Sequence, residues 1–197
     1  MQQTLQLCYK GERDYLHGTD MYAAVTAALR PVVGPKISSL PLQIGIHAFA
    51  RHQLNLVIDA NKSPPTNVIA TFKLGAETPL RGWLEETETA VDCRRPYPEE
   101  AIIACCALDG ERICTNSPPP FSPIEIAVAM TKALHNHLLP PQERRWIFSR
   151  LSLRRIFRDD DVHPVEIQLL QNLNNRLTRS AIRVGDDVLG DIFFSRV

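Results

Sequence analysis

A group of ionisable side chains stands just before an apolar segment near the start of the chain. Its members fall within residues 12–20: Glu12, Arg13, Asp14, Tyr15, His17 and Asp20. A loop histidine such as His17 can lose or accept a proton near neutral pH, because its unperturbed pKa is about 6.5. Beside it, Gly18 would let backbone approach a ligand, and the free N–H groups of a first helical turn could stabilise a developing oxyanion. This pattern fits proton transfer next to a carbonyl oxygen.

The same residues have a purely structural alternative. Thr19 or Asp20 is a good helix N-cap, since a side-chain oxygen there satisfies an orphan N–H group and a carboxylate complements the helix dipole. In that interpretation His17 is an ordinary loop residue. The residues alone leave both interpretations open.

A second candidate group is the arginines of segment 144–157. Strand alternation would place Arg150 and Arg154 on one solvent-facing stripe. The other members of that face would be Trp146, Phe148, Ser152 and Ile156, with Ile147, Leu151, Leu153 and Phe157 on the opposite face. The forked donors of arginine suit the phosphates of a nucleotide-containing ligand or the carboxylates of an acidic partner. The alternative is a solvated strand face whose charges discourage edge pairing.

The elements that must position these groups follow the same order twice. In the first half we predict a strand over 4–9, a helix with Met21, Val25, Ala28 and Leu29 on one face that Pro31 ends, and strands over 40–49, 53–60, 67–74 and 81–91. In the second half we predict a strand over 101–112, a helix over 122–139, and strands over 144–157, 164–171 and 179–195. The second helix opens with Ser122-Pro123-Ile124-Glu125, a capping box that accounts for Glu125 without catalysis.

Short matches between the halves favour a tandem duplication. Gly11-Glu12-Arg13 recurs as Gly110-Glu111-Arg112, and Lys73-Leu74-Gly75 resembles Arg183-Val184-Gly185. We therefore predict one unit over residues 1–92, a linker over 93–100 and a second unit over 101–197, packed as one body.

Composition narrows the classes of partner. The chain has 22 basic and 22 acidic residues, so no net field draws it to nucleic acid or to an anionic membrane surface. It has no apolar run of about 20 residues and no signal-like start, which predicts a cytoplasmic protein. No glycine-rich nucleotide motif or metal-ligand spacing is present, so no cofactor is expected. The five cysteines are odd in number, which favours reduced thiols, with Cys105 and Cys106 as packing residues of a strand.

The α+β pattern carries a resemblance to a known superfamily. The stretch PIEIAVAM is apolar on nearly every side, so its helix should be wrapped by strands. A strand, one buried helix and several antiparallel strands, given twice, resembles a double hot dog of the hot-dog superfamily, and the likeness covers most of the chain. It is a likeness of architecture without a diagnostic signature.

The resemblance implies a substrate and site residues. Its members include dehydratases and thioesterases that act on acyl thioesters of coenzyme A or of an acyl carrier protein. It implies that His17 transfers a proton, that Asp20 assists, and that substrate contacts come from Gly18, Thr19, Tyr22, Arg150 and Arg154. Dehydratases of this kind carry an acid well inside the helix, whereas AAVTAALR has none. That departure supports the alternative of a non-catalytic subunit that binds a carrier protein or a catalytic partner, or pairs with a second copy.

Overall fold

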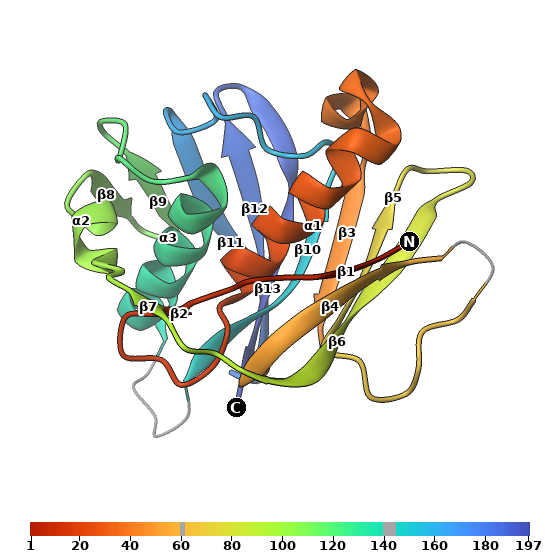
Figure 1. Cartoon of the computed structure of the whole chain (residues 1–197). Helices are drawn as coiled ribbons and strands as arrows, with labels where there is room; N and C mark the ends of the chain where they lie inside the picture. Colours follow the sequence, from red (N-terminus) through yellow and green to blue (C-terminus); the bar gives the residue numbers. More distant parts are fainter. Residues whose placement is uncertain (60–61, 140–144) are drawn as a thin grey trace. The chain divides into compact units, whose positions relative to one another are not determined.

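The computed structural model describes residues 1–59, 62–139 and 145–197 (Figure 1). The chain forms two compact units, Met1–Tyr97 and Pro98–Val197. Arg144, the first residue of one predicted strand, lies outside the described residues. Within those residues, no helix is long and apolar enough to cross a membrane.

The first unit is a curved antiparallel sheet with one long helix, α1 (Gly18–Val33). Its strands run in the order β1-β4-β6-β5-β3. Their bounds are β1 Gln2–Thr4, β3 Leu42–Ile46, β4 His52–Ile58, β5 Ala70–Leu74 and β6 Leu80–Ala90, and a 3-10 helix, η1, spans Pro35–Ser39. Two short strands, β2 (Tyr9–Lys10) and β7 (Arg94–Arg95), form a separate parallel pair.

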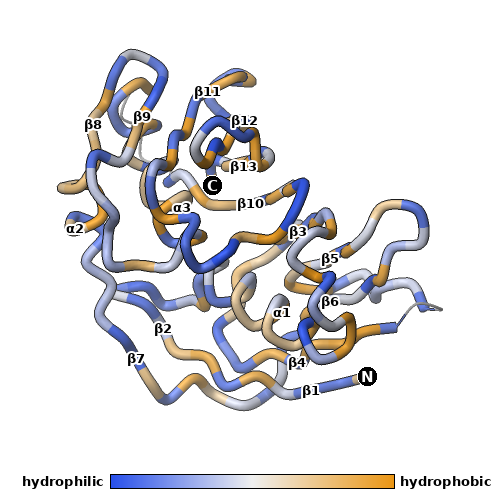
Figure 2. The backbone as a smooth tube through the Cα atoms, turned by 90° about the horizontal axis from the view of Figure 1, so that it is seen from above, coloured by the Kyte–Doolittle hydropathy of each residue, from blue (hydrophilic) through white to orange (hydrophobic). Residues whose placement is uncertain are grey.

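Helix α1 buries the face that the sequence predicted. Met21, Val25 and Leu29 are all at most 1% exposed, and the view from above places α1 within the curve of β3, β5, β6 and β4 (Figure 2). The helix begins earlier and ends later than predicted. Pro31 lies inside its last turn, and the chain leaves the helix at Gly34, whose φ of 75° suits a residue without a side chain.

The predicted first strand was partly wrong. Residues 5–8 of the expected strand 4–9 are not in a strand, and the segment contributes β1 and β2 at its two ends instead. Leu5 still donates its N–H to the carbonyl of Leu54, so the segment stays attached to the sheet edge.

The second unit is also antiparallel, with the order β10-β13-β12-β11-β9-β8. Its elements are α2 Glu99–Ile103, β8 Cys106–Asp109, β9 Arg112–Thr115, α3 Pro123–Leu138, β10 Trp146–Leu153, β11 Val165–Leu173, β12 Leu177–Val184 and β13 Asp187–Arg196. The strand predicted over 101–112 was wrong at its start, where the chain is helical. Cys105 consequently lies in a turn, and Cys106 is the first residue of β8.

Helix α3 begins as its sequence indicates. The N–H group of Ser122 donates to the Glu125 carboxylate at 3.1 Å, which completes the predicted capping box. Ten of its sixteen residues are buried, on more than one face. Its burial fits a helix wrapped by strands (Figure 2).

A β-bulge changes the expected face of the arginine segment. The register of β10 against β13 shifts between Phe148 and Arg150, so one extra residue is inserted there. As a result Trp146 and Phe148 are buried, and after the bulge Leu151 and Leu153 are buried as well. The prediction that Trp146 and Phe148 share a face with Arg150 was therefore wrong, because it assumed unbroken alternation. Of the remaining predicted members, Arg150, exposed over the Phe193 ring, and Arg154, exposed just after β10, do face solvent. Ile156 is 1% exposed, so its placement on that solvent-facing stripe was also wrong.

The two units place their strands alike except at the centre. In each unit, the third and fourth strands after the long helix form a hairpin. That hairpin lies between the first and the second strands after the helix. Gly75 and Gly185 both stand in that hairpin's turn with positive φ. The hairpin, however, is inserted in opposite order, as β3-β5-β6-β4 in one unit and β10-β13-β12-β11 in the other. Tandem duplication remains a hypothesis that must account for this exchange.

A buried histidine in the second unit gives that unit a pH-dependent stability. His135 is fully buried between the rings of Trp146 and Phe194, and burial, with the charge of Arg196, lowers its pKa from 6.5 to about 4. The unfolded chain therefore binds a proton more readily, and stability present above pH 6.5 is lost as the pH falls toward 4.

We expect about 3 kcal/mol of unfolding free energy to be lost across that pH range. Urea unfolding of wild type and of His135→Leu at several pH values measures the loss, which the variant should largely lack. The matched control is His137→Ala, since His137 is exposed on the same helix. An equal acid dependence in His135→Leu and wild type would contradict the prediction.

Candidate active site

The first helical turn of α1 meets a buried lysine that the sequence did not single out. Lys10, on β2, is 7% exposed, and its ammonium lies 2.8 Å from Oδ1 of Asp20 and donates to Oγ1 of Thr19 at 3.0 Å. A buried ammonium requires such a partner, because desolvation penalises an unpaired charge. Lys10 and Asp20 thus neutralise each other at the start of the helix.

His17 is the N-cap residue of α1, which corrects the prediction that Thr19 or Asp20 caps it. The backbone carbonyl of His17 accepts the N–H groups of Asp20 and Met21, and its side chain makes no capping hydrogen bond. Its ring is instead 6% exposed, with Nδ1 at 2.7 Å from Oγ1 of Thr19. The amides of Gly18 and Thr19 precede the first intrahelical hydrogen bond, so they are the donors of this helix end.

Tyr97, the last residue of the first unit, lies against the same group of side chains. Its ring, 8% exposed, lies 5.4 Å from the His17 ring, and the Lys10 ammonium and the Arg13 guanidinium lie 5.0 and 5.4 Å from its centroid. The aromatic face stabilises cations that are partly removed from water. Lys10, His17, Thr19, Asp20 and Tyr97 form what we call the His17 cluster.

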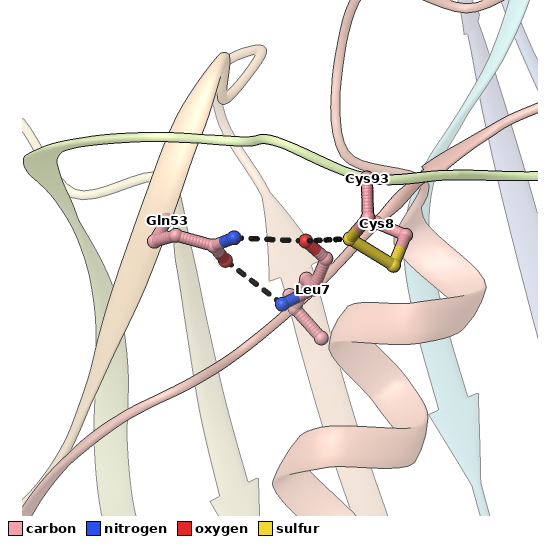
Figure 3. The surroundings of a disulfide bond; sticks show 4 residues. All are labelled: Leu7, Cys8, Gln53 and Cys93. Atoms are coloured by element: carbon pink, nitrogen blue, oxygen red, sulfur yellow. Dashed lines mark hydrogen bonds between the residues drawn. A yellow bond between two sulfur atoms is a disulfide. The ribbon is translucent and has the colours of Figure 1, made fainter.

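A covalent bond holds the two chain segments of the His17 cluster together (Figure 3). Cys8 and Cys93 form a disulfide across 85 residues, directly before β2 and β7. The side-chain amide of Gln53 both accepts the N–H group of Leu7 at 2.8 Å and donates to its carbonyl at 2.9 Å. The prediction that all five cysteines are reduced was therefore wrong. Residues 93–97, expected to be an exposed linker, instead contribute a strand and a buried ring to the first unit.

The remaining cysteines are free thiols. Cys105, Cys106 and Cys114 are half-buried, and burial, with the nearby Cys105 and Cys114, raises the pKa of Cys106 to about 11. A thiol that stays protonated at neutral pH is a poor nucleophile, so Cys106 behaves as a packing residue.

The predicted site residues divide between the two units. His17, Thr19 and Asp20 come together with Lys10 and Tyr97, and Gly18 supplies the first helical amide. Tyr22 lies one turn further along, buried at 5% exposure. Arg150 and Arg154 belong to the second unit.

Sequence reasoning missed Lys10 and Tyr97. Lys10 precedes Gly11 at the end of a short polar strand, where a lysine is usually solvent-exposed, and Tyr97 stands between two prolines in what looked like a linker.

The histidine could transfer a proton, and the helix amides could bind an oxyanion. In the described part of the chain, no group of three His, Cys, Asp or Glu residues could hold a metal ion.

Two compact units, each with antiparallel strands and one long buried helix, define the chain as an α+β protein that resembles the hot-dog fold. Solved structures bear this out. A monomeric dehydratase domain from a trans-AT polyketide synthase split module is 9% identical over 99% of this chain and 97% of that chain, with a TM-score of 0.52. A candidate thioesterase II from Thermobifida fusca YX is 11% identical over 94% and 88%, with a TM-score of 0.50.

A third similar structure holds a ligand. The dehydratase domain of PpsC from Mycobacterium tuberculosis, in complex with C12:1-CoA, is 9% identical over 93% of this chain and 85% of that chain, with a TM-score of 0.50. No protein-family model and no curated protein sequence matches the chain. At these sequence identities the likeness establishes the fold alone. The activity has to be argued from the residues of the candidate site.

Proposed function

We propose that this protein acts on an acyl chain carried as a thioester of coenzyme A or of an acyl carrier protein, by hydrolysis or dehydration. His17 is the proton-transfer residue, and the amides of Gly18 and Thr19 bind the thioester carbonyl oxygen. Asp20 assists indirectly, since its carboxylate holds Lys10 in place. Tyr22, Arg150 and Arg154 are proposed substrate contacts, the two arginines by pairing with phosphates or with an acidic carrier surface.

One observation carries the proposal. A histidine ring stands at the N-terminus of the long buried helix of a hot-dog-like unit, beside helix amides that can stabilise an oxyanion. The solved structures with this fold include a dehydratase domain in complex with an acyl-coenzyme A, which supports a thioester as the substrate class.

The test is turnover and capture of acyl thioesters. Purified protein should release free thiol from, or dehydrate, at least one member of a panel of acyl and 3-hydroxyacyl pantetheine and coenzyme A thioesters. Arg150→Glu with Arg154→Glu should raise KM for coenzyme A or carrier-protein substrates more than for pantetheine substrates, which lack the nucleotide and the protein. If no panel member is turned over or bound, the proposal fails.

A non-catalytic subunit is the second candidate, and a specific observation favours it. Asp20 is the one carboxylate of α1, and Lys10 pairs with it at 2.8 Å, so no acid deeper in that helix can serve as a catalytic partner for His17. A subunit of this kind would bind a thioester, a carrier protein, a catalytic partner or a second copy without turnover. In the thioester panel its signature is binding with no released thiol and no dehydrated product.

The cytoplasmic location stays a prediction. The Cys8–Cys93 disulfide bears on it, because disulfides persist mainly in oxidising compartments.

A further inference from the structure

Two polar rings meet without a hydrogen bond in the interior of the second unit. His135, in the last turn of α3, is 0% exposed, and Trp146, the first residue of β10, is 8% exposed. Their ring centroids lie 4.8 Å apart, and the ring of Phe194 covers a further side of the imidazole at 5.2 Å. Within the described residues, both ring nitrogens of His135 and Nε1 of Trp146 are buried without a hydrogen-bond partner.

Unpartnered polar atoms of this kind are costly in an apolar interior. A buried donor or acceptor loses its hydrogen bonds to water, and most such groups are paired with protein atoms or with ordered water. The indole of Trp146 does not donate to the imidazole of His135, although the two rings are in contact. Three such nitrogens on two adjacent rings therefore point to a bound polar ligand.

The donors and acceptors of the two rings specify this ligand. The indole N–H of Trp146 is a donor only, so the ligand must offer it an acceptor. Burial, with the charge of Arg196, lowers the pKa of His135 to about 4, so at neutral pH the ring is neutral and one of its nitrogens is an acceptor. A single atom that accepts from the indole and donates to the imidazole is a hydroxyl oxygen. A carboxylate has no hydrogen to donate, and an ammonium has no acceptor.

We propose that the second unit binds a hydroxyl group between His135 and Trp146, that of a water molecule or of a small alcohol. Its oxygen accepts a hydrogen bond from the indole N–H of Trp146 and donates its own hydrogen to the unprotonated nitrogen of His135. The protonated nitrogen points to another side of the ring and lies outside this bridge. Interior waters bound in this way are a regular part of folded proteins. The site belongs to the second unit, whereas the His17 cluster belongs to the first, and it does not rest on the proposed function.

The bridge is measured on the indole N–H without any substrate. The chain has two tryptophans, so ¹⁵N-labelled protein gives two indole signals, and Trp146→Phe assigns them. In wild type, the Trp146 N–H should show a nuclear Overhauser cross-peak to the bound molecule. A water gives the cross-peak at the water frequency, with the sign of a molecule that tumbles with the protein, and an alcohol gives it at the frequencies of its C–H protons. Trp83 is the reference for an indole bonded within the protein, because its Nε1 donates to Glu85 at 2.5 Å.

Substitutions of the acceptor test its part in the bridge. His135→Leu removes the acceptor and should abolish the cross-peak. His135→Gln keeps one donor and one acceptor on its side-chain amide, so it should retain the cross-peak, a rescue that packing alone would not produce. His137→Ala, on the exposed side of the same helix, should leave the cross-peak unchanged.

A wild-type Trp146 N–H whose cross-peaks all go to protein protons overturns the proposal. So does a cross-peak to water or alcohol that persists unchanged in folded His135→Leu, because the imidazole would then take no part. If a variant fails to fold, the wild-type spectrum decides the matter. Absence of thioester turnover would reject the proposed function and leave this result standing.

Discussion

His17→Ala should reduce kcat/KM for the best acyl thioester by about 10²–10⁴-fold, the range that a positioned proton-transfer residue contributes. The physical reason is that the variant keeps the helix amides of α1 but removes the imidazole that stands beside them. Steady-state assays at saturating and limiting substrate separate a loss of kcat from a rise in KM. A loss confined to KM would mean that His17 binds the substrate without taking part in the chemistry.

The matched control is His47→Ala. His47 is exposed on the same unit and shares a hydrogen bond with Thr71 at 2.9 Å, so its loss removes an imidazole without disturbing the His17 cluster. Since His17 is itself buried, each variant needs a melting curve, and His17→Gln serves if the alanine variant is too unstable. Full turnover in a folded His17 variant would refute the role assigned to this residue.

Removing the Cys8–Cys93 disulfide should lower the unfolding free energy of the first unit by about 4 kcal/mol. The bond joins cysteines 85 residues apart, and the chain-entropy description gives about 4–5 kcal/mol for a loop of this length, within the 2–5 kcal/mol seen when native disulfides are lost. Cys8→Ala with Cys93→Ala, compared with wild type in denaturant without reductant, measures the difference.

The same change should also weaken the site. The β2–β7 ribbon carries Lys10 and leads to Tyr97, so a looser ribbon holds the ammonium less firmly against Thr19. Cys114→Ala is the control, because Cys114 is a free thiol of the other unit. Adding reductant should destabilise wild type and the control but not the double variant. Equal stability of the double variant and wild type would show that the disulfide does not support the ribbon.

The sequence located the helix whose first turn carries the candidate site. The spacing of Met21, Val25 and Leu29 is a local property of a 3.6-residue repeat, and a capping box such as Ser122 with Glu125 spans a single turn. Local rules of this kind work without knowledge of the rest of the chain. They placed His17 at the entrance of α1, and the α+β class followed from the order of the elements.

Local rules failed where a distant segment or an irregularity decided the outcome. The bulge between Phe148 and Arg150 inverts the side-chain faces of β10, and alternation in the sequence contains no sign of the inserted residue. The two strands of the central hairpin also take opposite orders in the two units. That order depends on which of the two hairpin strands pairs with the first strand after the long helix.

The sequence by itself therefore determined the secondary-structure class and the position of His17 at a helix start, because periodicity and capping act over a few residues. Only the tertiary structure brought Lys10 and Tyr97 to that histidine and joined Cys8 to Cys93. The disulfide and the β2–β7 pair join chain segments 85 residues apart, whereas Lys10 stands only nine residues before Thr19 and is held there by that strand pair. A meeting of that kind results from packing of the whole unit, since neither segment carries a local pattern that specifies the other.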